Sequence, residues 1–125
     1  MEFIRGLRDL RVFVAAEDSA MVLFEWSRSF PQEEIYSLTT QLRRASRSVC
    51  ANIAEAWRKR RYPKHFVSKL SDAEAEAEET RVWIGFAARC GYVDPSRAQE
   101  MDRTYDQIIA QLVSMIAHPE QWCKL

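Results

Sequence analysis

Cationic side chains that could bind phosphate groups are concentrated in one stretch of the sequence. Residues 43–64 contain eight cations and a single anion, Glu55, although the net charge of the whole chain is +0. Arginine supplies 14 of the 18 cations, and its planar guanidinium donates paired hydrogen bonds to a phosphate or a carboxylate. A neutral chain does not coat nucleic acid by bulk electrostatics, so phosphate binding would depend on this local cluster. The eight candidate nucleic-acid-binding residues are Arg43, Arg44, Arg47, Arg58, Lys59, Arg60, Arg61 and Lys64.

The end of this stretch has two interpretations. Five cations fall within residues 58–64, more than the negative end of a helix dipole requires. Trp57 and Tyr62 lie among them as aromatic rings on which bases could stack, a pattern typical of nucleic-acid binding. The alternative is an ordinary solvated helix end, and the sequence leaves both interpretations open.

Polar residues also border the expected core in this segment. Arg44, Ser48, Asn52 and Glu55 follow one another at steps of four, four and three, which places them in one line along a helix. Because polar groups beside a core need partners, one interpretation is that this line pairs with an acidic neighbour such as Glu79 and fixes the register of two helices. The other is that it extends the basic surface.

The residues that most active sites require are missing. The two histidines, His65 and His118, have no cysteine, serine or carboxylate at a spacing that indicates a catalytic pair. A di-iron bundle would need Glu-x-x-His pairs, but Tyr62 and Met115 stand three positions before the histidines. No glycine-rich phosphate loop is present, and the five anions of residues 72–79 alternate with alanine, which predicts a solvated or salt-bridged helix face. We therefore predict no catalytic residues, no metal, no cofactor and no enzymatic activity.

The cysteines and the N-terminal residues bear on the compartment. Cys50, Cys90 and Cys123 are widely spaced and odd in number, unlike a disulfide framework or a zinc site. Idle thiols are typical of a reducing cytosol. Charged residues interrupt the start of the chain, unlike the apolar core of a signal peptide, and no apolar run is long enough to span a membrane. The sequence thus predicts a soluble cytoplasmic protein with no membrane partner.

Proline and glycine residues divide the chain into segments that each have a helical pattern. Pro31 suits the first position of a helix, and Gly91 suits the residue just after a helix. Apolar residues recur at alternating steps of three and four, which indicates left-handed packing at shallow angles, and short connections make neighbouring helices antiparallel. The prediction is one all-α domain over residues 1–125, an antiparallel up-and-down four-helix bundle. Its helical segments are residues 7–29, 31–60, 63–91 and 94–117.

The recurring apolar positions are the predicted core. They are Leu10, Phe13, Ala16, Ala20 and Phe24 in the first segment, Ile35, Leu38, Leu42, Ala45, Val49, Ile53 and Ala56 in the second, Phe66, Leu70, Ala73, Ala77, Thr80, Ile84 and Ala87 in the third, and Ala98, Met101, Tyr105, Ile108, Leu112 and Met115 in the fourth. Further apolar residues lie beside these positions, including Val12, Trp26, Val82, Trp83 and Phe86. They either widen the core face of each helix or form a surface for self-association.

A set of short motifs runs along nearly the whole chain. The motifs are Phe30-Pro31, Glu34, Leu38, Gln41-Leu42-Arg43-Arg44-Ala45, Ser48-Val49, Asn52-Ile53-Ala54-Glu55, and Glu79 twelve residues before Gly91-Tyr92. Their order resembles that of the four-helix bundle proteins encoded in intervening sequences of bacterial 23S ribosomal RNA genes, a superfamily that includes the accessory variability determinant proteins of diversity-generating retroelements. Two positions depart from the family pattern, with Ala56 in place of a glycine and Ala75-Glu76 in place of Gly-Ser.

The resemblance implies a cytosolic bundle that assembles as a ring-like homopentamer. It also implies association with RNA or DNA and, for the retroelement members, with a reverse transcriptase. The function that we expect is therefore a non-enzymatic oligomeric accessory protein that binds RNA or DNA through a basic surface of the second helix. The alternative is a protein–protein interaction or scaffold module with no nucleic-acid role.

Overall fold

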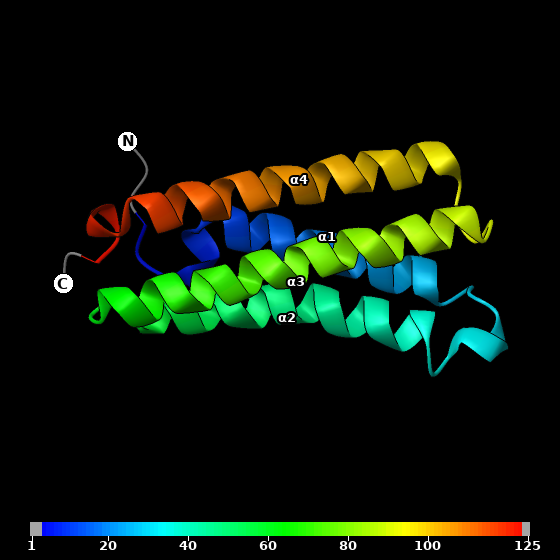
Figure 1. The fold of residues 1–125 in the computed structure, drawn as a ribbon, viewed down its shortest axis with the longest axis horizontal. Coiled ribbons are helices and arrows are strands. Elements are labelled where there is room, and N and C mark those ends of the chain that lie inside the picture. Colours follow the sequence, from blue (N-terminus) through cyan, green and yellow to red (C-terminus); the bar gives the residue numbers. More distant parts are fainter. Residues whose placement is uncertain (1–3, 124–125) are drawn as a thin grey trace.

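Four long helices run antiparallel to their neighbours in a computed structural model that describes residues 4–123 (Figure 1). No strand occurs among these residues, which confirms the predicted all-α four-helix bundle. The predicted domain limits, residues 1 and 125, lie outside the described part of the chain. The helices are α1 (Arg11–Ser27), α2 (Leu38–Arg58), α3 (Pro63–Arg89) and α4 (Pro95–Ala117), with short 3-10 turns η1 (Leu7–Asp9), η2 (Gln32–Glu34) and η3 (Pro119–Gln121).

One apolar core fills the space between the four helices. α2 packs on α1 and α3, and α4 packs on α3 and α1, so each helix has two neighbours. All seven core positions predicted in α3 are buried, as are those from Leu38 to Ala56 in α2. In α4 the prediction is confirmed except at Met101, which is half-buried. Within residues 4–123, no helix is both long and apolar enough to cross a bilayer.

The predicted core positions of α1 are wrong beyond Ala16. The buried residues that follow are Ser19, Leu23, Trp26 and Ser27, whereas the expected Ala20 and Phe24 are only half-buried. The helix keeps its steps of three and four, but the small polar Ser19 occupies a core position that an apolar pattern does not reveal. Val12 and Trp26 therefore belong to the core and not to a separate flank.

The second helix begins seven residues later than predicted. Pro31 has extended backbone angles (φ −55°, ψ 145°) and precedes the turn η2, and α2 starts only at Leu38. The physical reason is a local cap: the Glu34 carboxylate accepts hydrogen bonds from the Ser37 hydroxyl (2.7 Å) and the Leu38 N–H (3.4 Å). Ile35 is consequently outside the helix and 37% exposed, so its predicted core position is wrong.

The ends of α3 and α4 follow the predicted signals. Gly91 has a positive φ of 76°, which glycine tolerates without strain. Its N–H donates to the Ala88 carbonyl and the Tyr92 N–H donates to the Ala87 carbonyl, the two bonds of a Schellman motif. Asp94 then caps α4 by accepting a hydrogen bond from the Arg97 N–H.

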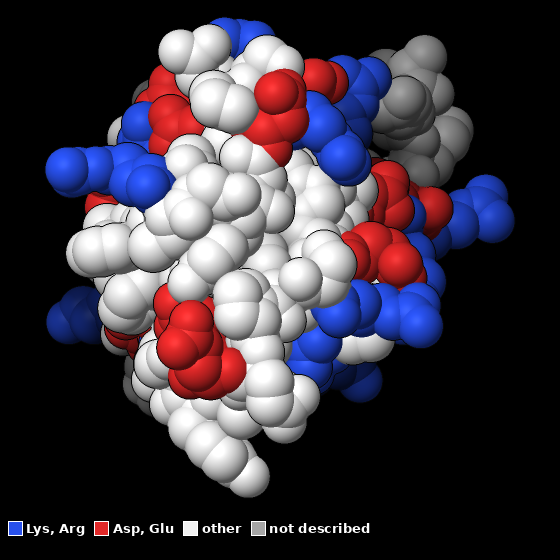
Figure 2. All heavy atoms as spheres, turned by 90° about the vertical axis from the view of Figure 1, so that its right-hand side faces the viewer, with Lys and Arg blue, Asp and Glu red and all other residues white. Residues whose placement is uncertain are grey.

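Several apolar side chains stay outside the core at the end of the bundle where α1 joins α2 and α3 joins α4. Tyr36 is 92% exposed, Phe86 52% and Val82 49%, and Trp83 is half-buried beside Phe86. Figure 2 looks onto this end and shows a broad uncharged area, interrupted by carboxylates, with most cations toward the edge. Because these residues lie outside the core, they form the apolar end surface of the molecule, defined here as Tyr36, Val82, Trp83 and Phe86.

Candidate nucleic-acid interface

The outward face of α2 has arginines separated by small residues. Arg47, Ala51 and Arg58 are exposed and follow at steps of four and seven, so they share one face of the helix. At a rise of about 1.5 Å per residue, Arg47 and Arg58 are roughly 16 Å apart along the axis. An open groove of about 810 Å³ follows the first part of this face and is lined by Thr40, Arg43, Arg44, Arg47, Ser48 and Ala51.

Two arginines of this groove also contact α1. The Nε of Arg43 donates a 2.7 Å hydrogen bond to the Ser27 hydroxyl, and its guanidinium lies 4.9 Å from the centre of the Phe24 ring. The Arg47 guanidinium lies 5.6 Å from the same ring. Phe24, which the sequence predicted as core, is thus covered by two cations. Arg43 is half-buried and joins the helices, whereas Arg47 keeps an exposed side chain.

Arg44 is engaged with carboxylates of α3. Its guanidinium forms an ion pair with Glu79 and another with Glu76, at 3.4 Å. Glu79 also accepts a hydrogen bond from the Trp83 indole N–H at 3.3 Å. The predicted pairing of Arg44 with Glu79 is confirmed, and Glu55, farther along the same line, pairs with Lys69 of α3 at 3.7 Å. These bonds fix the register of α2 against α3 and neutralise the charge of Arg44.

Three of the five carboxylates in the acidic run of α3 form salt bridges and Asp72 is exposed to solvent, so the solvated or salt-bridged face that the sequence predicted is confirmed. Besides Glu76 and Glu79, Glu78 pairs with Arg81 at 3.3 Å. Arg81 also pairs with Asp102 (3.0 Å) and Asp106 (3.4 Å) of α4, and the hydrogen bond to Asp102 is the main cause that raises the Arg81 pKa. Arginines thus hold Glu76, Glu78 and Glu79. No cluster of metal-binding side chains occurs among the described residues.

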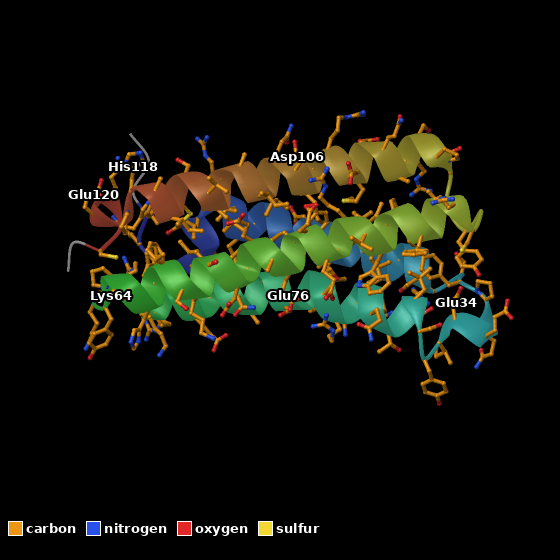
Figure 3. All side chains as sticks on the ribbon, in the orientation of Figure 1. Glu34, Lys64, Glu76, Asp106, His118 and Glu120 are labelled. Carbon is orange, nitrogen blue, oxygen red and sulfur yellow. The ribbon has the colours of Figure 1, made fainter. Side chains whose placement is uncertain are left out.

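The cations at the α2–α3 connection are of two kinds. Arg58, Lys59, Arg61 and Lys64 are exposed, and within residues 4–123 none of them forms an ion pair with a carboxylate. We call these residues the cationic cluster. Figure 3 labels Lys64 at the end of the bundle opposite Glu34, so the cluster and the apolar end surface lie at opposite ends.

Arg60 differs from its neighbours because it packs against the protein. Its Nε donates a 2.8 Å hydrogen bond to the Trp57 carbonyl, and its guanidinium lies 3.6 Å from the centre of the Trp57 ring. Burial lowers the pKa of Arg60, and the positive charge of nearby Arg58 lowers it further. The adjacent Cys123 partly raises this pKa again. Trp57 itself is only 5% exposed, so its predicted role as a stacking platform is wrong. A tryptophan so close to helix-core positions is buried by its neighbours, which the charge pattern around it does not indicate.

Tyr62 remains available as an aromatic surface. It is 57% exposed and its ring lies 5.6 Å from the His65 ring, at an angle of 40°. His65 also lines a shallow hollow of about 410 Å³ with Lys59, Ser68 and Lys69.

The other histidine, His118, lies 3.4 Å from Glu120 on an exposed turn. No disulfide joins the cysteines, of which Cys90 is exposed, and burial raises the pKa of Cys50 to about 11.

Comparison with known proteins identifies the family. The family model for the 23S rRNA-intervening sequence protein matches residues 8–114. The chain belongs to this family. The match extends from η1 to the last turns of α4, so it includes all eight candidate residues of the interface. No curated protein matches the chain.

A solved structure supports the same fold. It is the crystal structure of a protein of unknown function from the S23 ribosomal protein family of Bacteroides thetaiotaomicron. The two chains are 24% identical and superpose with a TM-score of 0.76, over 85% of this chain and 95% of that one. At this identity the likeness concerns the fold, and it shows that this chain has the helix arrangement of that structure.

Proposed function

We propose that this member of the 23S rRNA-intervening sequence protein family is a non-enzymatic accessory protein that binds RNA or DNA through α2 and the α2–α3 connection. The observation that carries the proposal is the cationic cluster: four exposed cations within seven residues, none paired with a carboxylate in the described part of the chain. Elsewhere on α2 and α3, Arg44, Lys69 and Arg81 are neutralised by carboxylates. Unpaired cations held this close together suit the closely spaced phosphates of a nucleic acid.

The eight candidate residues have different roles in this proposal. The cationic cluster and Arg47 contact phosphates, because they are exposed and carry no carboxylate partner within residues 4–123. Arg43, Arg44 and Arg60 support the surface, because each is bonded to Ser27, Glu79 or Trp57 respectively. Their charge adds to the local potential without a direct phosphate contact.

We propose further that the protein acts as a homo-oligomer, a pentamer by its family resemblance, assembled through the apolar end surface. A patch with a 92% exposed tyrosine and a 52% exposed phenylalanine suits an interface between subunits. A symmetric assembly would repeat the cationic cluster once per subunit, and multivalent contact raises avidity without a stronger single site. We also propose, from the resemblance, a relationship to the accessory variability determinant proteins of diversity-generating retroelements, which would make a reverse transcriptase a candidate protein partner.

A second candidate function is a protein–protein interaction module with no nucleic-acid role. It is favoured by the hollow of about 690 Å³ next to the apolar end surface, which Tyr36, Leu38, Trp83 and Phe86 line together with polar residues. In that case the cationic cluster would be a solvated helix end.

A salt titration of binding separates the two candidates. The test variant replaces Arg58, Lys59, Arg61 and Lys64 with Gln. The control variant also replaces four cations with Gln, at exposed arginines outside the cluster: Arg28, Arg89, Arg97 and Arg103. Each lost phosphate contact reduces the log–log slope of affinity against salt by about 0.7 on a single strand, so the test variant should lose about 3 units and the control none. Equal slopes for the parent and the test variant would contradict nucleic-acid binding by the cluster and favour the interaction module.

A further inference from the structure

The backbone of Tyr62 is held in place within the cationic cluster, and its ring lies against the His65 ring. The Tyr62 N–H donates to the Lys59 carbonyl, and the Tyr62 carbonyl accepts from the N–H groups of His65 and Phe66, all at 2.9 Å. The contact with the His65 ring supports one side of the side chain. More than half of Tyr62 nevertheless remains exposed, at 57%. An exposed ring on a fixed backbone, supported on one side by another side chain, loses little conformational entropy when a base stacks on it.

Charge surrounds this ring on both sides along the chain. Lys59 and Arg61 precede it and Lys64 follows it, and all three are exposed cations of the cluster. The hollow lined by Lys59, His65, Ser68 and Lys69 adjoins it. A flat ring flanked by cations combines the two features used by proteins that bind single strands, a stacking platform and cations that follow the backbone.

The alternative aromatic ring is closed to a ligand. Trp57 is 5% exposed and Arg60 covers it at 3.6 Å. Of these two rings, Tyr62 is therefore the one that a base could reach, with the exposed His65 ring beside it.

We infer that Tyr62 stacks on an unpaired base and that the site prefers single-stranded nucleic acid to duplex. A duplex presents phosphates to the cations, but its base faces are covered by neighbouring base pairs, so the ring adds nothing to duplex binding except at an end. In a single strand or a loop, a base can turn onto the ring while the phosphates on either side meet Lys59, Arg61 and Lys64. This inference rests on the proposed function and adds the class of ligand.

The experiment compares Tyr62→Ala and Tyr62→Phe with the parent protein by fluorescence anisotropy. The probes are a labelled unstructured single-stranded RNA, a single-stranded DNA of the same sequence, and a long blunt-ended duplex, which has no unpaired loop and whose two ends are few compared with its internal base pairs. Stacking on one base accounts for about 5-fold in affinity or more. Tyr62→Ala should weaken single-strand binding by at least that factor and leave duplex binding unchanged, while Tyr62→Phe retains the affinity of the parent. The salt slope should not change, because no charge is removed.

A second measurement uses the parent protein and does not depend on a variant. A single strand with 2-aminopurine at successive positions should lose fluorescence at one or more positions on binding, since stacking quenches this base. Equal weakening of single strand and duplex by Tyr62→Ala, or no change in either, would overturn the inference, as would unquenched 2-aminopurine. If the four-glutamine variant flattens the salt slope while Tyr62→Ala changes nothing, the stacking fails and the proposed function stands. If the parent binds none of the three probes, both fail.

Discussion

The hydroxyl of Tyr92 donates a 2.8 Å hydrogen bond to the Glu34 carboxylate, across 58 residues of sequence. The bond joins the connection before α2 to the connection after α3. The Phe30 and Tyr92 rings also lie in contact, 5.4 Å apart. Glu34 at the same time caps α2 through Ser37 and Leu38. One carboxylate therefore holds both the start of α2 and the adjacent connection.

This arrangement predicts a dependence of stability on acid pH. The hydrogen bond from Ser37, followed by that from Tyr92, lowers the pKa of Glu34 below its ordinary value of 4.5. A carboxylate with a lowered folded-state pKa stabilises the protein above its unfolded pKa, and this contribution is lost as the pH falls through the folded pKa. The melting temperature of Glu34→Gln should be lower than that of the parent at pH 7, and the difference should shrink below about pH 4.5. A difference that stays constant from pH 7 to pH 3 would contradict this role of the Glu34 charge.

The core makes the largest predicted contribution to stability. Leu42 and Leu112 are both 0% exposed and lie midway along α2 and α4. Leu42→Ala and Leu112→Ala should each lower the free energy of unfolding by about 2–5 kcal/mol, through lost burial and a residual cavity. Thermal and urea unfolding measure this. Val113→Ala, on the exposed surface of α4, is the control and should change the free energy of unfolding little. If the Leu42 and Leu112 variants have the melting temperature of the parent, the core is misassigned.

Arg44 and Arg47 form a matched pair of neighbouring arginines on α2. Arg44→Gln breaks the ion pairs with Glu76 and Glu79 and should lower the free energy of unfolding by up to about 1 kcal/mol, a small value because the side chains are partly exposed. Arg47→Gln leaves no carboxylate unpaired in residues 4–123 and should change stability less. A double-mutant cycle of Arg44 with Glu79 measures the coupling directly. Zero coupling energy would contradict a role for this pair in the α2–α3 register.

Arg58 and Arg60 form a second matched pair, at the end of α2. Arg60→Gln removes the contact with the Trp57 ring and should lower the free energy of unfolding by about 0.5–2 kcal/mol. Arg58→Gln should leave stability near that of the parent but weaken nucleic-acid binding at low salt. Chemical unfolding and binding titrations of both variants check the division. The opposite pattern, with Arg58 the stabilising residue, would show that the roles are exchanged.

Phe86 tests the proposed assembly. The chain has a mass of 14.6 kDa, so light scattering at micromolar concentration should return a multiple of this value for the parent. Phe86→Glu places a charge in the apolar end surface and should shift the mass toward the monomer while the helix content stays the same. Val22→Glu, on the exposed face of α1, is the control and should not change the mass. A parent protein that is already monomeric would remove the proposed homo-oligomer.

The fold could be predicted from the sequence because helix signals and core positions agree over most of the chain. Gly91 and Asp94 mark their helix ends by backbone and capping chemistry, and the core of α3 repeats without interruption. The prediction failed at two places for different reasons. In α1 the polar Ser19 occupies a core position. Before α2, the Glu34 carboxylate caps the helix at Leu38, whereas Pro31 suggested an earlier helix start.

The candidate site could be predicted only in part, for a related reason. A cluster of cations is visible in the sequence, but whether a cation is exposed or engaged depends on residues far along the chain. Arg43 meets Ser27 of α1, and Arg44 meets Glu79 of α3. The pairing of Arg44 could be anticipated because it borders the core, whereas the cover of Trp57 by Arg60 depends on the geometry of the helix end.

The length of α3 has a consequence for electrostatic communication within the molecule. This helix of 27 residues connects the cationic cluster to the apolar end surface and is about 40 Å long at 1.5 Å per residue. The screening length in physiological salt is about 8 Å, so a charge at one end of α3 exerts almost no force at the other. A charge removed from the cationic cluster therefore leaves the electrostatic potential at the apolar end surface almost unchanged, and a charge added to the apolar end surface does the same for the cationic cluster.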